Sequence, residues 1–235
     1  MKLLQAPFKV VKRAARILAR SDIYIATQLA CGVVYLGNAG TSWPLCPEAL
    51  PYQPLVYSFG VGEDVSFDLE LIRRFDATIH AFDPTPRSVA WIARQQLPPN
   101  FHFHPCGIAN HEGVCSFLPP ENPAHVSHTI IARHSVAPAL ELPVKRMQTF
   151  LSELQHPHID LLKMDIEGAE YAVIDDLIAS RILVKQLLVE FHHRWKEIGI
   201  SKTKEAVRNL NATGYRIFAV SPNGEEYGFL NPDAC

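Results

Sequence analysis

The sequence has little cysteine, and its cysteines follow no paired pattern. The five are Cys31, Cys46, Cys106, Cys115 and Cys235, and no two of them form a Cys-x-x-Cys pair. An odd and scattered set argues against a disulfide framework and against a zinc knuckle. We therefore expect unpaired thiols and a cytoplasmic location, where the reducing environment suits them.

The sequence also lacks long hydrophobic runs and an excess of charge of one sign. The apolar stretch over residues 23–37 is interrupted by Thr27 and Gln28, so it is too short to span a bilayer, and a signal peptide is not expected. Lysine and arginine total 22 against 24 aspartate and glutamate, a net charge of -2. This balance gives no sign of a nucleic-acid-binding protein.

The first 20 residues contain several basic residues, and no acidic residue occurs before Asp22. Apolar side chains fall there at helical spacing, at Val10, Ala14, Ile17 and Leu18. We predict a basic amphipathic helix in a separate N-terminal segment, residues 1–36. It either packs over the rest of the chain with its bases in water, or makes peripheral contact with an anionic membrane or a partner through residues 1–20.

From residue 55 onward, strand-like apolar runs alternate with helix-like segments. The expected strands cover residues 55–59, 78–82, 101–105, 159–164 and 185–191. The expected helices end near residues 75, 96, 154, 180 and 212. A final pair of strands, 215–220 and 226–230, is joined at an Asn-Gly turn. The pattern predicts an α/β fold: a doubly wound, mainly parallel, Rossmann-like sheet with a C-terminal antiparallel hairpin.

Two proline-rich segments interrupt this alternation. Residues 37–54 are expected to be a loop, in which Trp43 either covers a ligand pocket or closes the edge of the core. Residues 117–143 form an excursion with short strands expected at 113–118 and 140–145. Inserted segments of this kind commonly form lids over a substrate, so Ser127 or His128 is a candidate contact for an acceptor, with a plain polar loop as the alternative.

The turn after the first strand carries the first functional signal. Gly60 and Gly62 allow bare backbone to approach a ligand at the carboxyl end of a parallel strand. The third glycine of a dinucleotide fingerprint is missing, and Glu63 and Asp64 open the helix where they would repel a pyrophosphate. Asp83 ends the next strand, where an acid can hold ribose hydroxyls. This combination favours cationic S-adenosylmethionine over NAD.

Acids and histidines follow the fourth and fifth strands. Asp165 and Glu167 are placed to hold the amino group of a methyl donor, to act as a base or to bind a cation. Glu190 and His192 occupy alternate positions, so we expect them to point together, with the histidine as a proton acceptor. Glu170 is expected to be structural at a helix start. The spacing is not compact, and no metal site is predicted.

Four stretches together resemble the FkbM-type methyltransferases. They are VYSFGVGED at 56–64, HAFDPTP at 80–86, DLLKMDIEGAE at 160–170 and VEFHH at 189–193. The resemblance covers residues 43–230 and implies a class I, S-adenosylmethionine-dependent enzyme that methylates hydroxyls on sugars or natural products. It also implies that the donor is lined by Gly60, Gly62 and Glu63, held at the ribose by Asp83, bordered at the adenine by Gly107 and Ile108, and met at the methyl by Asp165.

We therefore expect residues 37–235 to form a methyltransferase domain acting on a hydroxyl of a carbohydrate or small metabolite. The candidate catalytic residues are Asp165, His192, Glu190 and His128. Two alternatives stay open. One is a non-catalytic module that keeps the fold and acts at a membrane or partner. The other is an NAD-dependent oxidoreductase.

Overall fold

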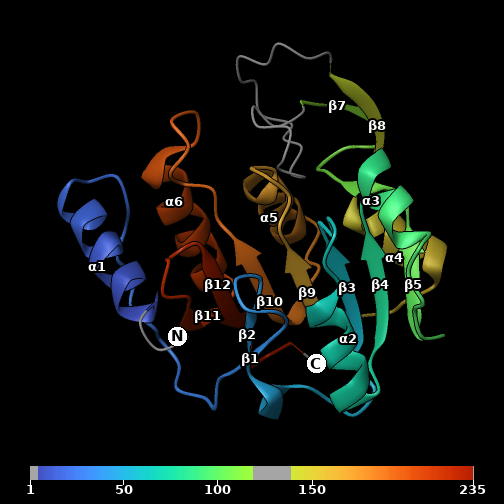
Figure 1. Cartoon of the computed structure of the whole chain (residues 1–235), viewed down its shortest axis with the longest axis horizontal. Helices are drawn as coiled ribbons and strands as arrows, with labels where there is room; N and C mark the ends of the chain where they lie inside the picture. The colour runs from blue at the N-terminus through green and yellow to red at the C-terminus, as the bar shows by residue number, and fades with distance from the viewer. Residues whose placement is uncertain (1–4, 119–138, 235) are drawn as a thin grey trace.

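A seven-stranded sheet forms the centre of the molecule (Figure 1). The structure is a computed structural model that describes residues 5–118 and 139–234. The strand order is β11-β12-β10-β9-β3-β4-β5, and β12 runs antiparallel to both of its neighbours while the other pairs are parallel. The strands are β3 Leu55–Phe59, β4 Thr78–Phe82, β5 Phe101–His104, β9 Ile159–Met164, β10 Val184–Glu190, β11 Arg216–Val220 and β12 Glu226–Leu230. The predicted fold class is confirmed.

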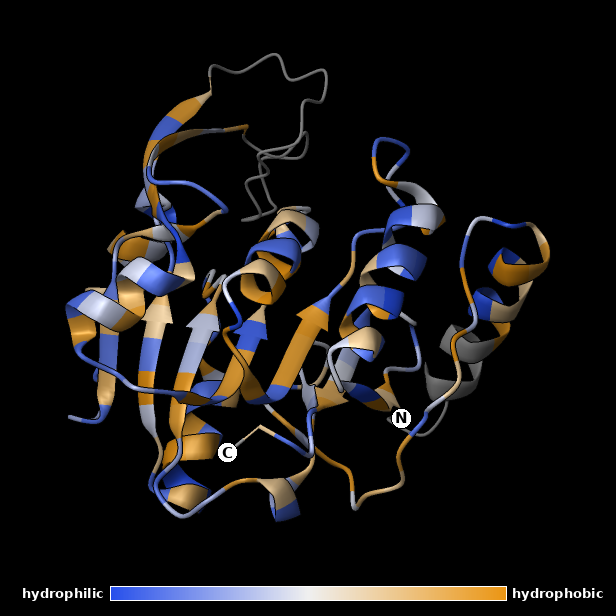
Figure 2. Cartoon of the chain, turned by 180° about the vertical axis from the view of Figure 1, so that it is seen from behind, coloured by the Kyte–Doolittle hydropathy of each residue, from blue (hydrophilic) through white to orange (hydrophobic). Residues whose placement is uncertain are grey.

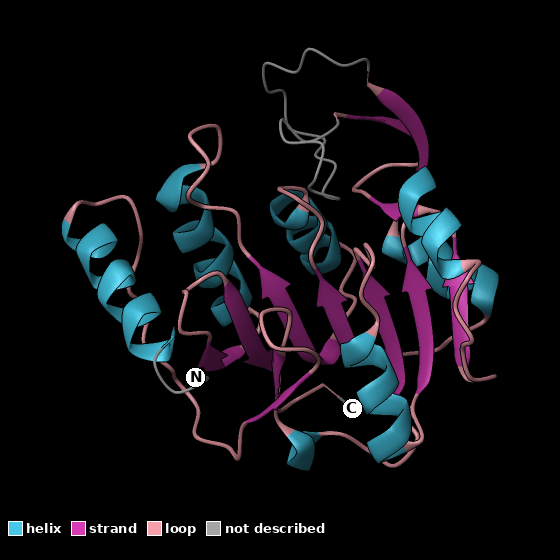
Figure 3. Cartoon of the chain, in the orientation of Figure 1, coloured by secondary structure: helices cyan, strands magenta, loops and turns pink. Residues whose placement is uncertain are grey.

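Helices cover both faces of this sheet (Figure 3). They are α2 Ser66–Phe75, α3 Pro86–Ile92, α4 Met147–Leu154, α5 Glu170–Ala179 and α6 Gly199–Ala212. Strand alternation explains the two layers, because Leu162 packs in the core with α4, α5 and α6 whereas Leu161 packs in the core with α2 and α3. The predicted helix to residue 96 ends earlier, at Ile92.

The prediction of a plain loop over residues 37–54 is wrong. An antiparallel hairpin of β1 Val34–Leu36 and β2 Trp43–Leu45 precedes a 3-10 turn, η2 Pro47–Ala49. Leu36, Trp43 and Leu45 are buried in the core with α2, and Cys46 exchanges two backbone hydrogen bonds of 2.9 Å with the amide side chain of Gln186. Burial against a strand distant in the sequence therefore orders a segment whose composition is typical of a loop.

A small second sheet stands above the carboxyl ends of β3 and β4 (Figure 1). It contains β6 Gly107–Ile108, β7 Gly113–Phe117 and β8 Leu140–Lys145 in the order β6-β8-β7, which confirms the two predicted short strands. Ser127 and His128 lie outside the described residues, and the lid stays a prediction.

The N-terminal segment is tied to the edge of the large sheet. Helix α1, Gln5–Leu18, carries both blue and orange residues in Figure 2. Arg13 donates to the carbonyl oxygens of Ser221 and Ile23, each at 3.2 Å, and the buried carboxylate of Asp22 pairs with Arg194 at 2.6 Å. The predicted helix thus forms, and Leu18 is 86% exposed on it. Contact with a membrane or partner through this helix stays a prediction. None of the helices in residues 5–118 and 139–234 has the length and hydropathy to cross a bilayer.

A group of four histidines lies on one side of the β4–β5 edge. His80 is 8% exposed, and its Nδ1 lies 2.9 Å from Nε2 of His104. Its ring centroid lies 4.9 Å from that of His102 and 4.6 Å from that of His156. Burial, reinforced by the charge that His156 would carry, lowers the pKa of His80 to about 3.

We expect His80 to make the fold sensitive to acid. Below pH 6.5 the unfolded chain protonates this residue while the folded chain does not, so the free energy of unfolding falls by about 1.4 kcal/mol per pH unit, or roughly 2 kcal/mol by pH 5. Urea unfolding of the wild type and of His80→Phe between pH 7 and 5 measures the effect. Between pH 7 and 5 the free energy of unfolding of the variant is expected to fall by roughly 2 kcal/mol less than that of the wild type. An equal fall in the two proteins would refute the assignment.

Candidate active site

A pocket opens at the carboxyl ends of β3, β4 and β9, beneath the small sheet. Its volume is about 360 Å³, within the range of small-molecule sites. All seven positions predicted for the donor line it: Gly60, Gly62, Glu63, Asp83, Gly107, Ile108 and Asp165. The structure therefore brings together residues from four separate segments of the chain.

Gly60 lies where three strands end. Its N–H donates to the carbonyl of Phe82 at 3.0 Å, while the N–H of Asp165 donates to the carbonyl of Phe59 at 3.1 Å. The backbone at Gly60 has φ +80, and a Cβ added there would lie 1.7 Å from the carbonyl oxygen of Asp165. Only glycine lets the turn after β3 approach the end of β9 so closely.

Asp83 holds the glycine turn from the neighbouring strand. Its Oδ2 accepts from the N–H of Gly62 at 2.9 Å, and its Oδ1 accepts from the N–H and the hydroxyl of Thr85 at 2.9 and 2.6 Å. A carboxylate has about four acceptor positions, so about one is left for a ligand. The carboxylate thus fixes the glycine turn in the pocket wall, and it can still accept one hydrogen bond from a hydroxyl of a ligand.

The two acids at the start of α2 divide their roles. Asp64 accepts from the N–H of Ser66 at 2.8 Å and from the hydroxyl of Thr41 at 2.6 Å, so it closes a turn just before the helix. Glu63 pairs with Arg87 at 2.8 Å, and this hydrogen bond lowers the pKa of the Glu63 carboxyl. Both acids line the pocket, and each carboxylate also has a partner within the protein.

Acidic side chains far outnumber basic ones in the described lining of the pocket. They are Glu63, Asp64, Asp68, Asp83, Asp165 and Glu167, and the single basic residue among the lining residues is Lys163. The Nζ of Lys163 donates to the carbonyl of Gly60 at 3.2 Å and lies 4.9 Å from the ring centroid of Trp43. The pocket is therefore suited to a cationic ligand and unsuited to a pyrophosphate.

Lys163 and Trp43 clarify what sequence reasoning left open. The sequence pattern does not indicate a role for Lys163. It lies near the end of β9, two residues before Asp165, so the two side chains are expected to point to the same face of the sheet. Trp43 is 5% exposed, lines the pocket and packs on Phe67 with ring centroids 6.5 Å apart. It therefore closes the edge of the core and borders the ligand site at once.

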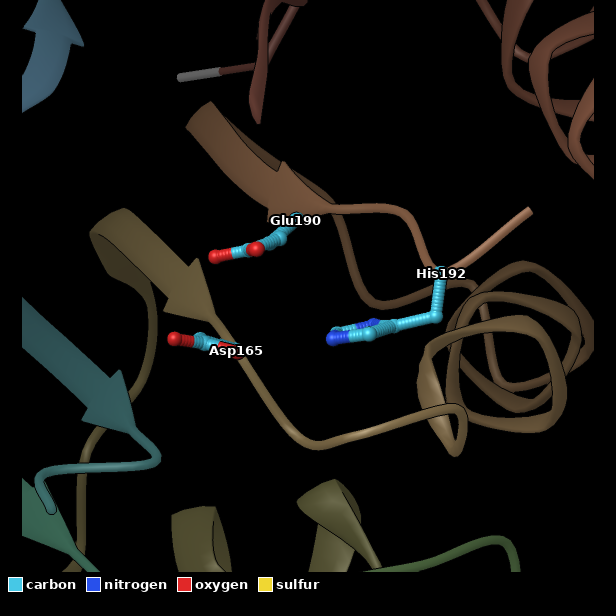
Figure 4. Close-up of side chains that lie close together, drawn as sticks. All are labelled: Asp165, Glu190 and His192. Atoms are coloured by element: carbon cyan, nitrogen blue, oxygen red, sulfur yellow. The ribbon is translucent and has the colours of Figure 1, made fainter. Parts of the chain in front are cut away.

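A second group of side chains adjoins the pocket through Asp165. One oxygen or nitrogen from each of Asp165, Glu190 and His192 lies within 4.8 Å of the other two. Figure 4 shows the two carboxylates side by side and the imidazole ring extending toward them. Glu190 and His192 thus point together as predicted from their alternate positions.

Two further carboxylates lie within ion-pair distance of the ring of His192. Its Nδ1 lies 3.0 Å from Oε1 of Glu170, and its Nε2 lies 3.2 Å from Oε2 of Glu167. Glu170 is fully buried and accepts from the N–H groups of Ile166 and Gly168, both at 3.1 Å. Glu170 thus has the structural role predicted for it, since it holds the backbone at the start of α5. Its contact with His192, a candidate catalytic residue, was not predicted.

Burial and mutual charge separate the pKa values in this group. Burial raises the pKa of Asp165 to about 6, with Glu167 adding to the shift. Burial also raises the pKa of Glu190 to about 10, with Asp165 adding to it. Burial acts to lower the pKa of His192, but Glu170 and Glu167 outweigh it and raise that pKa well above its ordinary value. Near neutral pH, Asp165 is therefore the better proton acceptor.

The neighbouring histidine has a different role. The side chain of His193 is buried, with its Nε2 2.9 Å from Oδ1 of Asp22. It fastens the N-terminal segment to the end of β10. Of the two adjacent histidines, only His192 joins the group around Asp165.

The model of the methyltransferase FkbM domain matches residues 56–217. The human "Probable methyltransferase-like protein 24" is 26% identical over 225 residues, covering 83% of this chain and 54% of that protein. Its rat counterpart is 27% identical over 177 residues, covering 69% of this chain and 42% of that protein. The chain thus spans about half the length of these curated relatives.

Two more proteins are similar at lower identity. "Methyltransferase 1" of Beauveria bassiana is 23% identical over 202 residues, covering 76% of this chain and 79% of that protein. Among solved structures, the methyltransferase FkbM from Methylobacillus flagellatus KT aligns with a TM-score of 0.47 and 10% identity, covering 76% of this chain and 43% of that one.

Proposed function

Because the chain belongs to the FkbM methyltransferase family, we propose that it transfers a methyl group from S-adenosylmethionine to a hydroxyl of a carbohydrate or small metabolite. The observation that carries the proposal is the pocket where the turn at Gly60, the carboxylate of Asp83 and the carboxylate of Asp165 meet. Three neighbouring parallel strands deliver these groups to one edge of the sheet, where ligands of such folds bind.

The residues of the pocket fit this donor. Phe59 and Phe82 stack with ring centroids 4.3 Å apart at the pocket wall, beside Ile108 of the small sheet, and offer an apolar surface for an adenine. Asp83 retains an acceptor for a ribose hydroxyl. The acidic lining favours a sulfonium and an ammonium. When bound, S-adenosylmethionine supplies an electrophilic methyl group at its sulfonium.

The chain's own residues would position the acceptor and receive its proton. Asp165 borders the pocket and is the ionised carboxylate of its cluster near neutral pH, so it takes the proton from the acceptor hydroxyl. Glu190 and His192 lie beside it and orient that hydroxyl. Holding two reactants in attack geometry can contribute several orders of magnitude to the rate.

We predict that Asp165→Asn lowers kcat by about 10²- to 10⁴-fold, the usual contribution of a positioned base, while donor affinity changes much less. The measurement is transfer of labelled methyl from S-adenosylmethionine to a panel of sugars and hydroxylated small molecules. Asp175→Asn, on the exposed face of α5, is the matched control and should retain wild-type turnover. Full turnover by Asp165→Asn would show that this carboxylate is not the base.

The alternatives have weaker support. An NAD-dependent oxidoreductase must bind a pyrophosphate, which the acidic lining of the pocket disfavours. A non-catalytic module would have no need for an ionised carboxylate bordering the donor pocket. Label transfer to any acceptor in the panel would exclude the module.

A further inference from the structure

We propose that Asp165, Glu190 and His192 bind one divalent metal ion, and that this ion holds the acceptor oxygen. The proposal rests on the proposed function, because it deepens the account of the same site. The three side chains come from the carboxyl ends of β9 and β10, and their ligand atoms lie within 4.8 Å of one another (Figure 4). Two carboxylates and an imidazole are ligand types that Mn²⁺ and related divalent ions accept. Binding of the ion would release the protons that Glu190 and His192 otherwise hold near neutral pH.

The ring of His192 is oriented as in many metal sites. A ligating histidine usually has its other ring nitrogen held by a carboxylate, which fixes the ring and its tautomer. Here Nδ1 lies 3.0 Å from the fully buried Glu170, which two backbone N–H groups hold in turn. Nε2 lies 3.2 Å from Oε2 of Glu167, so this carboxylate also lies beside the cluster.

An unsatisfied oxygen points to the same conclusion. Oδ1 of Asp165 is buried and has no hydrogen-bond partner among the described residues. A buried carboxylate oxygen without a partner is costly, and a metal ion would satisfy it. The nearby Lys163 offsets part of the negative charge, but its Nζ is bonded to the carbonyl of Gly60.

The position of the cluster indicates that the ion serves the acceptor and not the donor. Asp165 lines the donor pocket, whereas Glu190 and His192 are absent from its lining. The cluster thus lies beside the pocket and shares one residue with it. An ion there would hold an acceptor oxygen next to the donor.

Open coordination positions imply a class of acceptor. Three protein ligands leave about three positions of an octahedral ion for water or substrate. A hydroxyl with a second oxygen on the adjacent carbon can chelate such an ion through both. We therefore expect the acceptor to be a vicinal diol or an α-hydroxy acid.

The test is titration of the full chain with Mn²⁺, with neither donor nor acceptor present, while electron paramagnetic resonance reports free Mn²⁺. We expect saturable binding of one ion per chain. Asp165→Asn and Glu190→Gln should each weaken it by at least about 100-fold. Glu170→Gln, which changes a contact of the histidine and no ligand of the ion, should weaken it by about 10- to 100-fold. Glu205→Gln, an exposed acid on α6, is the matched control and should bind as the wild type does.

Thermal unfolding with and without Mn²⁺ distinguishes loss of the metal site from a general loss of stability in a variant. Mn²⁺ should raise the melting temperature of the wild type and of Glu205→Gln by mass action, and should not raise that of Glu190→Gln, whatever its starting value. Absence of saturable binding, or equal affinity in the ligand variants and the wild type, would overturn the site. Calorimetry with S-adenosylmethionine distinguishes the two proposals. Donor binding without Mn²⁺ binding would refute the metal site alone. Mn²⁺ binding without donor binding would support the metal site and refute the proposed function.

Discussion

Replacing Gly60 with alanine is expected to destabilise the fold by at least about 3 kcal/mol and to abolish binding of S-adenosylmethionine. An added Cβ would lie 1.7 Å from the carbonyl oxygen of Asp165, and the backbone at φ +80 is strained for any residue with a side chain. Relief requires β3 and β9 to separate at the end where they form the pocket. Urea unfolding and calorimetric titration measure the two effects.

Gly62→Ala is the matched control for this prediction. Gly62 also has a positive φ, +58, but a Cβ there would meet no atom within 4 Å. Its substitution should therefore cost only the backbone strain, about 1 kcal/mol. Equal losses of stability in the two variants would mean that the close approach to Asp165 is not what requires glycine at position 60.

Replacing Asp83 with alanine is expected to weaken binding of S-adenosylmethionine by about 100-fold. The change removes a charge-assisted hydrogen bond to the ligand, which contributes about 1.5–3 kcal/mol. It also releases the N–H of Gly62 and both donors of Thr85, so the turn loses its anchor on β4. Calorimetry gives the affinity directly.

The control for Asp83→Ala is Glu70→Ala, which removes an acid from α2 outside the pocket lining. It should leave donor affinity unchanged, although it breaks the surface pairs with Arg73 and Arg74. Wild-type affinity in Asp83→Ala would exclude a role for this carboxylate in holding the donor.

The parts of the fold that the sequence predicted well are those set by local pattern. Strands β9 and β12 begin and end at the predicted residues, because a short apolar run is bounded by polar or turn-forming residues. The pocket positions Gly60, Asp83 and Asp165 were also predictable, since each directly follows a strand whose carboxyl end must lie at one edge of a parallel sheet. Gly107 and Ile108 were expected only from the family resemblance, and they form strand β6 of the small sheet.

The parts that escaped prediction depend on contacts between distant residues. The hairpin at Trp43 is ordered by burial and by Gln186, which no local pattern indicates. The register of β9 and β10 pairs Met164 with Val189, which brings the residues after them, Asp165 and Glu190, side by side. Neither strand alone reveals this register, so the compact group with His192 could not be identified from spacing.

The most direct test of the account is calorimetric titration of the chain with S-adenosylmethionine and S-adenosylhomocysteine, with NAD as the control. The account predicts roughly micromolar affinity for the first two, about -8 kcal/mol, and no binding of NAD, because the pocket is acidic and lacks a pyrophosphate site. Binding of NAD, or of none of the three, would contradict the assignment of the pocket at Gly60, Asp83 and Asp165 to a methyl donor.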